Sequence, residues 1–343
     1  MKRFLSTALV LVLLCFSAAN VFSADYALVQ LSILPGIALP FGASDAAISL
    51  GTIGNISGRV DFLQAAGVFN IARGIRGLQL GGVFNIAGKE MGGVQAAGVF
   101  NIAGDMHTSL QLGGVFNIAD GLWGSQLGGV FNIAGDVQGA QLAPVLNVAK
   151  DLRGFQVGLV NIAGQVRGFQ IGLVNISVNG IFEVSTTWEP QTEYLGVMLK
   201  MGNTSLYAIY SVNAPRNELF KVPDNTILSA GLGSRIGDSK GLHVDFSASA
   251  SQAIGSDLGR FESAWTWRDG LTPADVLAPW PALEASLSLR LAGLKLTGGF
   301  RSDIYLASFP NLPAGRAQGF AYSDTWFGES FTAWNKLYVG IGL

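Results

Sequence analysis

Hydrophobic and polar positions recur with a fixed period through the first half of the chain. The clearest units read QLGGVFNIA, at residues 79–87 and again at 111–119. Their Asn recurs nine times at spacings of 14 to 16 residues, at Asn55, Asn70, Asn85, Asn101, Asn117, Asn132, Asn147, Asn161 and Asn175. Helical repeats need roughly 33 residues or more per unit, so this period excludes them. The abundance of Val, Ile and Phe instead predicts strands.

Two architectures fit a repeat of this length. Each unit is either one coil of a β-solenoid or one long strand of an antiparallel outer-membrane barrel, which would then have about 16–18 strands. The Gln that opens eight units lies six residues before the Asn in six of them and five residues before it at Gln156 and Gln170. In a continuous strand this change would move the Asn to the opposite face, because side chains alternate. A corner between Gln and Asn absorbs it, and Pro144 also suits a corner.

We therefore predict an all-β fold whose first part is a solenoid with coils of 14–16 residues. Each coil would contain two short strands, a Gly corner between them and a longer polar turn. We expect apolar positions such as Leu80 and Phe84 to form the core, and Gln79, Asn85 and Ala87 to point away from it. The single barrel remains the alternative.

Stacked coils would place identical residues at roughly 4.8 Å, so their amides would form hydrogen-bonded ladders. The predicted ladder residues are Asn70, Asn85, Asn101, Asn117, Asn132, Asn147, Asn161 and Asn175, together with Gln79, Gln95, Gln111, Gln126 and Gln141.

Charged residues are absent between the Gln and the Ala of these units and collect in the intervening turns. Four carboxylates fall near the same turn position in consecutive units: Asp105, Asp120, Asp136 and Asp151. A stacked carboxylate column could attract calcium, which prefers several oxygen ligands. Asp is also a common turn residue, so a hydrated column is the simpler interpretation.

Beyond residue 179 the repeat stops and a period of two begins. Apolar and polar residues alternate through 242–249, 283–291 and 337–343, and a hairpin is expected at Ala292-Gly293. This region also holds six of the seven Trp and six of the seven Tyr residues. Such strands are typical of an antiparallel outer-membrane barrel, with a soluble antiparallel sandwich as the alternative. Residues 255–281 are predicted to form a long surface loop.

The beginning of the chain is typical of a secretory signal peptide over residues 1–24. Lys2 and Arg3 precede an apolar run at 8–14, and small residues follow at 23–24. The only Cys, Cys15, lies in this segment. We interpret it as an apolar residue of the signal rather than a lipidation site, because Leu14 occupies the position normally held by a small residue. The domain prediction is completed by capping strands at 25–50, the repeat array at 51–178 and a barrel-like domain at 179–343.

Composition narrows the function classes. With 49% hydrophobic and 13% charged residues, the chain has about half the usual charge of a soluble domain, which favours a membrane or repeat protein. Without Lys2 and Arg3, the 21 basic residues fall to 19 against 23 acidic ones, a net charge of −4. This offers no basic footprint for nucleic acid. His243 and Asp245 share a strand face and could belong to a nucleophilic triad, but an ordinary polar pair is the simpler interpretation.

The repeat units resemble a family of bacterial surface-repeat proteins found in spirochaetes and other diderm bacteria. The resemblance rests on units such as GFQVGLVNIA at 154–163, followed by FEVS at 182–185 and a strand-rich tail. Members are described as exported or outer-membrane-associated, so the resemblance implies a location and no activity.

From these observations we expect a non-enzymatic surface or outer-membrane protein without a cofactor. Its repeat array would serve as a scaffold or as an interaction surface for a protein or a surface polymer. The alternative is a porin-like channel in which the repeats are transmembrane strands. The expected location is the outer membrane or cell surface, with the periplasm as the alternative.

Overall fold

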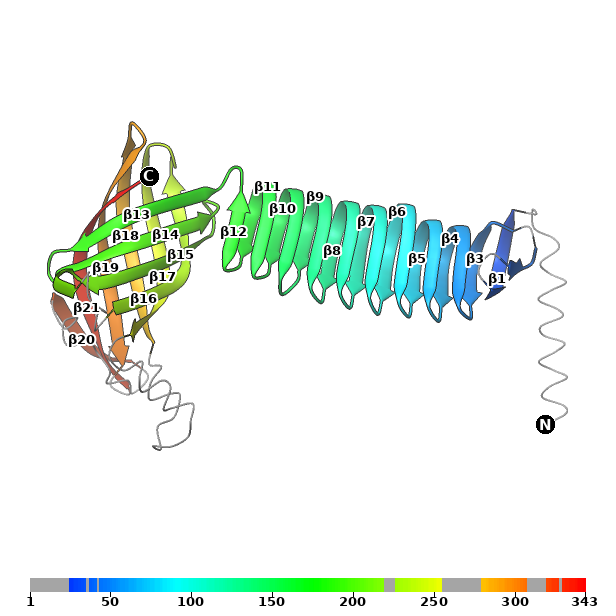
Figure 1. Ribbon diagram of the computed structural model, residues 1–343, viewed down its shortest axis with the longest axis horizontal. Coiled ribbons are helices and arrows are strands. Elements are labelled where there is room, and N and C mark those ends of the chain that lie inside the picture. Colours follow the sequence, from blue (N-terminus) through cyan, green and yellow to red (C-terminus); the bar gives the residue numbers. More distant parts are fainter. Residues whose placement is uncertain are drawn as a thin grey trace. The chain divides into compact units, whose positions relative to one another are not determined.

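The computed structural model describes residues 25–34, 37–41, 43–218, 226–254, 279–306, 319–326 and 329–343, and it divides into two compact units between Gly168 and Phe169. The units are built almost entirely of strands, so the all-β prediction is confirmed (Figure 1). The predicted signal peptide lies outside the described residues, as does most of the predicted loop at 255–281. The end of that loop prediction is wrong, because Trp280 begins a strand.

The first sheet contains twelve strands within the described part of the chain. They are β1 (Tyr26–Leu34), β2 (Ile37–Leu39), β3 (Asp45–Gly51), β4 (Gly54–Ala66), β5 (Phe69–Gly81), β6 (Phe84–Ala97), β7 (Phe100–Gly113), β8 (Phe116–Gly128), β9 (Phe131–Leu142), β10 (Leu146–Val157), β11 (Val160–Ile171) and β12 (Val174–Ser177).

Neighbouring repeats run in the same direction. From β3 to β10 each strand pairs in parallel with the next, and β11 and β12 continue the sheet. The register places Asn117 beside Asn101 and Asn132. The units are therefore stacked coils, and the solenoid is confirmed (Figure 1). The single barrel of many antiparallel strands is wrong.

Each coil is one long bent strand rather than two short ones. Strand β8, for example, includes the charged residue Asp120 and ends at Gly128, where the predicted Gly corner follows. The predicted polar turn is wrong, because its backbone continues the ladder between coils. The strand bends there at glycines with positive φ, such as Gly139 (φ 143°), which lies between Gly124 and Gly154 of the adjacent coils.

Differences in unit length are absorbed at the two edges of the coil. Strand β9 ends at Leu142 and β10 begins at Leu146, whereas only two residues separate the end of β10 at Val157 from β11. The corner thus takes up the shorter Gln-to-Asn spacing as predicted, and Pro144 lies in it. The longer units add their residue at the charged edge, for example between Ala87 and Glu90. The ladder residues therefore remain aligned.

The predicted assignment of faces is wrong, because the amides lie inside the coil. Asn85, Gln79 and Ala87 are fully buried, whereas Leu80 is 39% exposed. The prediction assumed that apolar side chains alone could fill the core. Stacking gives these two amides hydrogen-bond partners from the neighbouring coils, which offsets the cost of burying them.

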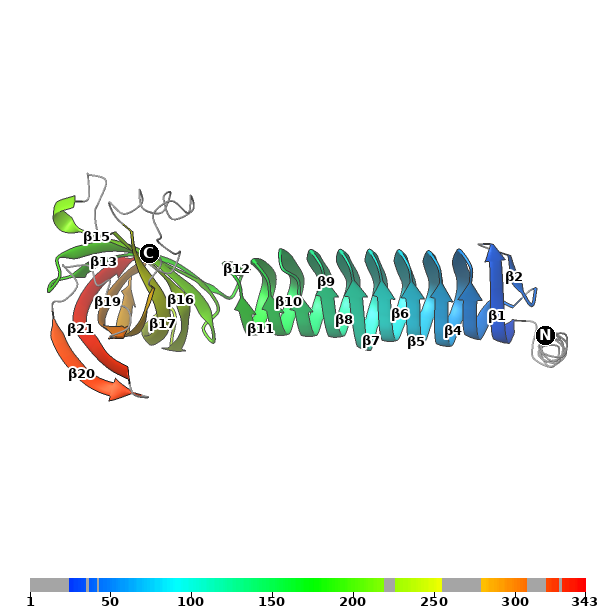
Figure 2. The ribbon, with the colours of Figure 1, turned by 90° about the horizontal axis from the view of Figure 1, so that it is seen from below.

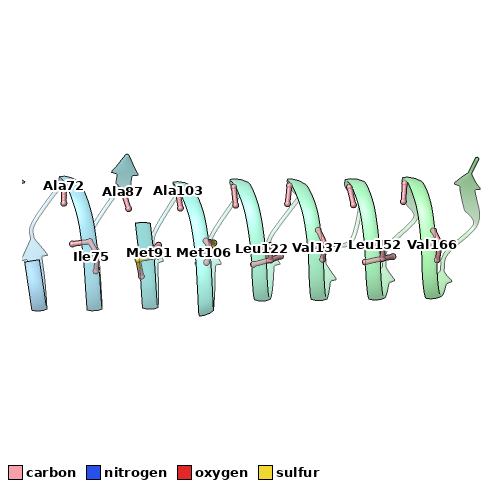
Figure 3. Close-up of a cluster of buried hydrophobic side chains, with 14 of the residues drawn as sticks. Ala72, Ile75, Ala87, Met91, Ala103, Met106, Leu122, Val137, Leu152 and Val166 are labelled. Atoms are coloured by element: carbon pink, nitrogen blue, oxygen red, sulfur yellow. The ribbon is translucent and has the colours of Figure 1, made fainter. Parts of the chain in front are cut away.

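An apolar column fills the interior near the charged edge (Figure 3). It combines one larger side chain from each coil with an Ala from every coil but the first; the larger members are Val60, Ile75, Met91, Met106, Leu122, Val137, Leu152 and Val166. At the N-terminal end, where capping strands were predicted, β1 and β3 pair in parallel and β2 adds an antiparallel edge.

The second unit is a closed antiparallel barrel. Its strands are β13 (Ile181–Glu189), β14 (Tyr194–Gly202), β15 (Tyr207–Pro215), β16 (Thr226–Gly237), β17 (Leu242–Ile254), β18 (Trp280–Leu291), β19 (Leu294–Leu306), β20 (Phe320–Trp326) and β21 (Glu329–Gly342). Strand β21 pairs with β19 along its length and with β13 at its end, which closes a ring of eight strands (Figure 2). Strand β20 pairs with the first half of β21. The hairpin predicted at Ala292-Gly293 joins β18 to β19.

Candidate functional site

The outer surface of the barrel is apolar. Along β18, Leu283 and Leu287 are 50% and 54% exposed, whereas the alternate residues Glu284, Ser286 and Ser288 are buried. The same pattern holds around the ring; outward apolar side chains include Phe182, Val184, Val197, Val212, Leu228, Ile236, Leu242, Phe246, Leu289, Leu296, Phe300, Leu337, Val339 and Ile341. Water-soluble sheets place polar residues on the exposed face, so the sidedness of this barrel is reversed.

The interior of the barrel contains a buried ionic network centred on Arg235. Its guanidinium donates two hydrogen bonds to the Glu183 carboxylate, at 2.8 and 2.7 Å. It donates two more to Asp245, from Nε at 2.7 Å and from Nη2 at 3.0 Å. Lys200 Nζ also donates to Asp245, at 2.6 Å. These four side chains come from β13, β14, β16 and β17, so the network ties four strands together across the lumen.

Two further cations, Lys295 and Arg290, contact Glu183 from strands on the other side of the ring. Lys295 Nζ donates to Glu183 Oε2 at 2.7 Å, and Arg290 Nη2 donates to Oε1 at 3.0 Å. Lys295 is almost fully buried, whereas the Arg290 side chain is 26% exposed. Glu183 therefore joins β13 to β16, β18 and β19.

A second network fills another level of the lumen. Arg301 donates to Glu284 Oε1 at 2.6 Å, to Asp303 Oδ1 at 2.9 Å and to Ser251 Oγ at 2.6 Å. Lys336 of β21 contacts the other oxygen of Asp303. All of these side chains are buried. The two networks place paired charges where a water-filled pore would otherwise run.

Sequence reasoning missed these networks, although a signal was present. Charges of both signs occupy the polar positions of alternating strands, for example Glu183 between Phe182 and Val184. His243 and Asp245, interpreted from the sequence as an ordinary polar pair, are both buried inside the barrel. Asp245 is held by cations rather than by the His243 ring, so the triad hypothesis gains no support.

The buried amides of the solenoid form two ladders. Asn117 Nδ2 donates to Asn132 Oδ1 at 2.9 Å and accepts from Asn101 Nδ2 at 2.9 Å through its own Oδ1. In the second ladder, Gln126 Nε2 donates to Gln111 Oε1 at 2.7 Å. The Asn side chains thus donate to the following coil, and this bond repeats from Asn55 to Asn161. The Gln side chains donate to the preceding coil, and this bond repeats from Gln64 to Gln156.

The four aspartates do not form one continuous column. Asp105 aligns with Gly121, then Asp136 and Asp151, whereas Asp120 lies one position earlier in its coil. Three of them, Asp105, Asp120 and Asp136, line a shallow depression of about 290 Å³ beside Trp123. Lys150 lies 3.9 Å from Asp136. The depression combines carboxylates with a cation.

Within the described residues, no group of three or more His, Cys, Asp and Glu side chains is arranged to hold a metal ion. The described helices include none that is long and apolar enough to cross a membrane. Comparisons with protein-family models, with curated proteins and with solved structures found no match to this chain.

Proposed function

We propose that the protein is a non-enzymatic outer-membrane protein. Its barrel is the membrane anchor, and its solenoid is a rigid scaffold and interaction surface. The observation that carries this proposal is the reversed sidedness of the barrel, with apolar residues such as Leu287 outside and ionic networks around Arg235 and Arg301 inside. A bilayer supplies the apolar surroundings that such an exterior requires.

The strand lengths support the same proposal. A transmembrane strand needs about 9–11 residues when tilted. The shortest strands of the ring, β13, β14 and β15, have 9 residues each, and the longest, β21, has 14. Every strand of the ring is therefore long enough to cross the hydrocarbon region. The predicted signal peptide provides the export that this location requires.

The test is fractionation of cells that express the chain, followed by electrophoresis with and without heating. We expect the mature protein in the outer-membrane fraction and a different migration before and after heating, because a closed barrel resists detergent until it is heated. Recovery in the soluble periplasmic fraction, with no effect of heating, would contradict the proposal and favour the periplasmic alternative.

Because the repeats are stacked coils, a channel would have to run through the eight-stranded barrel alone, and planar bilayers test for it. Because buried, paired charges occupy the lumen, we expect the purified barrel to give no reproducible conductance steps. The conductance of an Arg235→Ala variant is compared with that of the unaltered protein, since this change removes the side chain that bridges Glu183 and Asp245 in the lumen. Reproducible steps from the unaltered protein would favour a channel over a plugged anchor.

A further inference from the structure

The outward surface of the solenoid is apolar on three sides. In the coil formed by β8 and β9, Leu127 lies on one face, Val130 at the corner and Ile133 on the other face, and they are 41%, 38% and 37% exposed. Stacking repeats each position from coil to coil, so each becomes an apolar column. The aromatic rings of the second face stack as well: Phe100 and Phe116 lie 4.9 Å apart and parallel.

The charged residues of the coils occupy the remaining side. Between residues 59 and 167 there are seven basic and six acidic residues, and all of them lie at the charged edge opposite the Gly corner. Asp136 and Lys150 are typical, with side chains that are 68% and 77% exposed. The solenoid is therefore amphipathic around its own axis, with a nearly neutral polar edge.

The backbone at the corner is also satisfied internally. Gly129 N donates to Gly113 O at 3.0 Å, and both Val130 N and Phe131 N donate to Val115 O, at 2.7 and 3.2 Å. The amide side chains of these coils are buried and bond to one another. Placing the corner in hydrocarbon would leave no backbone donor of these residues without a partner, which is the main requirement for protein inside a bilayer.

We propose that the solenoid lies along a lipid bilayer with its Gly corner and both faces in contact with acyl chains and its charged edge in water. The distribution of apolar positions favours a bilayer over a second copy, because a second copy would cover one face and leave the other face and the corner in water. A polar polymer would find few hydrogen-bonding side chains on these columns. The near neutrality of the edge means that zwitterionic lipids suffice.

This inference rests on the proposed membrane location, and single-cysteine labelling tests the two separately. The predicted mature chain contains no Cys, so each variant carries one label. Leu127→Cys, Val130→Cys and Ile133→Cys report on the solenoid, Asp136→Cys is the water-facing control, and Leu287→Cys reports on the barrel. Each variant is labelled with a bimane and reconstituted in phosphatidylcholine nanodiscs that contain acyl-chain nitroxides.

We expect the labels on both solenoid faces and at the corner to be quenched as strongly as the barrel label, and several-fold more than the label at residue 136. If the barrel label is quenched and all three solenoid labels match the control, the inference is wrong while the membrane anchor stands. If the label on only one face is shielded from water, and equally so with and without lipid, a second copy covers that face. The inference is again wrong in that case. If the barrel label is not quenched, the proposed function itself fails.

Discussion

Replacing Asn117 by Ala tests the amide ladder directly. Asn117 is fully buried and donates to Leu127 O at 2.8 Å and to Asn132 Oδ1 at 2.9 Å. Ala removes the whole amide, so Asn132 Oδ1 loses its ladder donor and Asn101 Nδ2 loses its ladder acceptor, keeping only its bond to Leu112 O. A buried group left without its partner costs about 1–3 kcal/mol, and the void left by the shorter side chain adds to this cost. We therefore expect a loss of about 2–4 kcal/mol.

Hydrogen exchange measured by mass spectrometry is the suitable assay, because a repeat array can open locally. At about 1.4 kcal/mol per factor of ten, exchange in β7, β8 and β9 should accelerate roughly 30-fold to 700-fold. The matched control is Asp120→Ala, an exposed change in the same strand that should alter the opening free energy by less than about 0.5 kcal/mol. Equal exchange in the two variants would refute the shared ladder.

Three further changes separate other parts of the structure. Gly139→Ala should destabilise the solenoid by more than about 3 kcal/mol in an unfolding measurement, because φ is +143° and the new Cβ would lie 1.9 Å from Gly124 O. The control is Gly88→Ala, whose Cβ meets only ordinary contacts and which should be nearly neutral in the same measurement. Leu287→Arg should cost about 2–4 kcal/mol in lipid but little if the barrel is soluble, as judged by urea unfolding in vesicles. Deleting residues 336–343 removes the pairs that β21 makes with β13, so the heat-dependent shift on gels should disappear; normal assembly would contradict this role.

The order of the elements could be predicted from the sequence because it depends on periodicity. The spacing of Gln and Asn located the corner, and the alternation at 283–291 located β18. Which face is buried could not be predicted the same way, since alternation only divides residues into two sets. Judged by polarity alone, Leu80 was expected in the core and Gln79 outside it. Gln79 is buried instead, because Gln64 and Gln95 of the adjacent coils satisfy its amide. These hydrogen bonds join residues that are 15 or 16 positions apart in the sequence, so local patterns do not reveal them.

The ionic networks were beyond sequence reasoning for a related reason. Glu183 and Lys295 are far apart in the chain and meet only because the barrel closes. Period two places each on the inner face, but the partner of each charge depends on strand order and register. The inward charges could therefore have been predicted as a set, and their pairing could not.

The opposite directions of the two ladders have an electrostatic consequence. A row of side-chain amides that all donate the same way adds its dipoles along the axis, as peptide groups do in a helix. In this solenoid the Asn row points along the chain and the Gln row points against it. Their axial dipoles therefore oppose one another in every coil. However many coils are stacked, the two amide rows therefore contribute little net dipole along the axis, and neither end of the array acquires a strong partial charge from them.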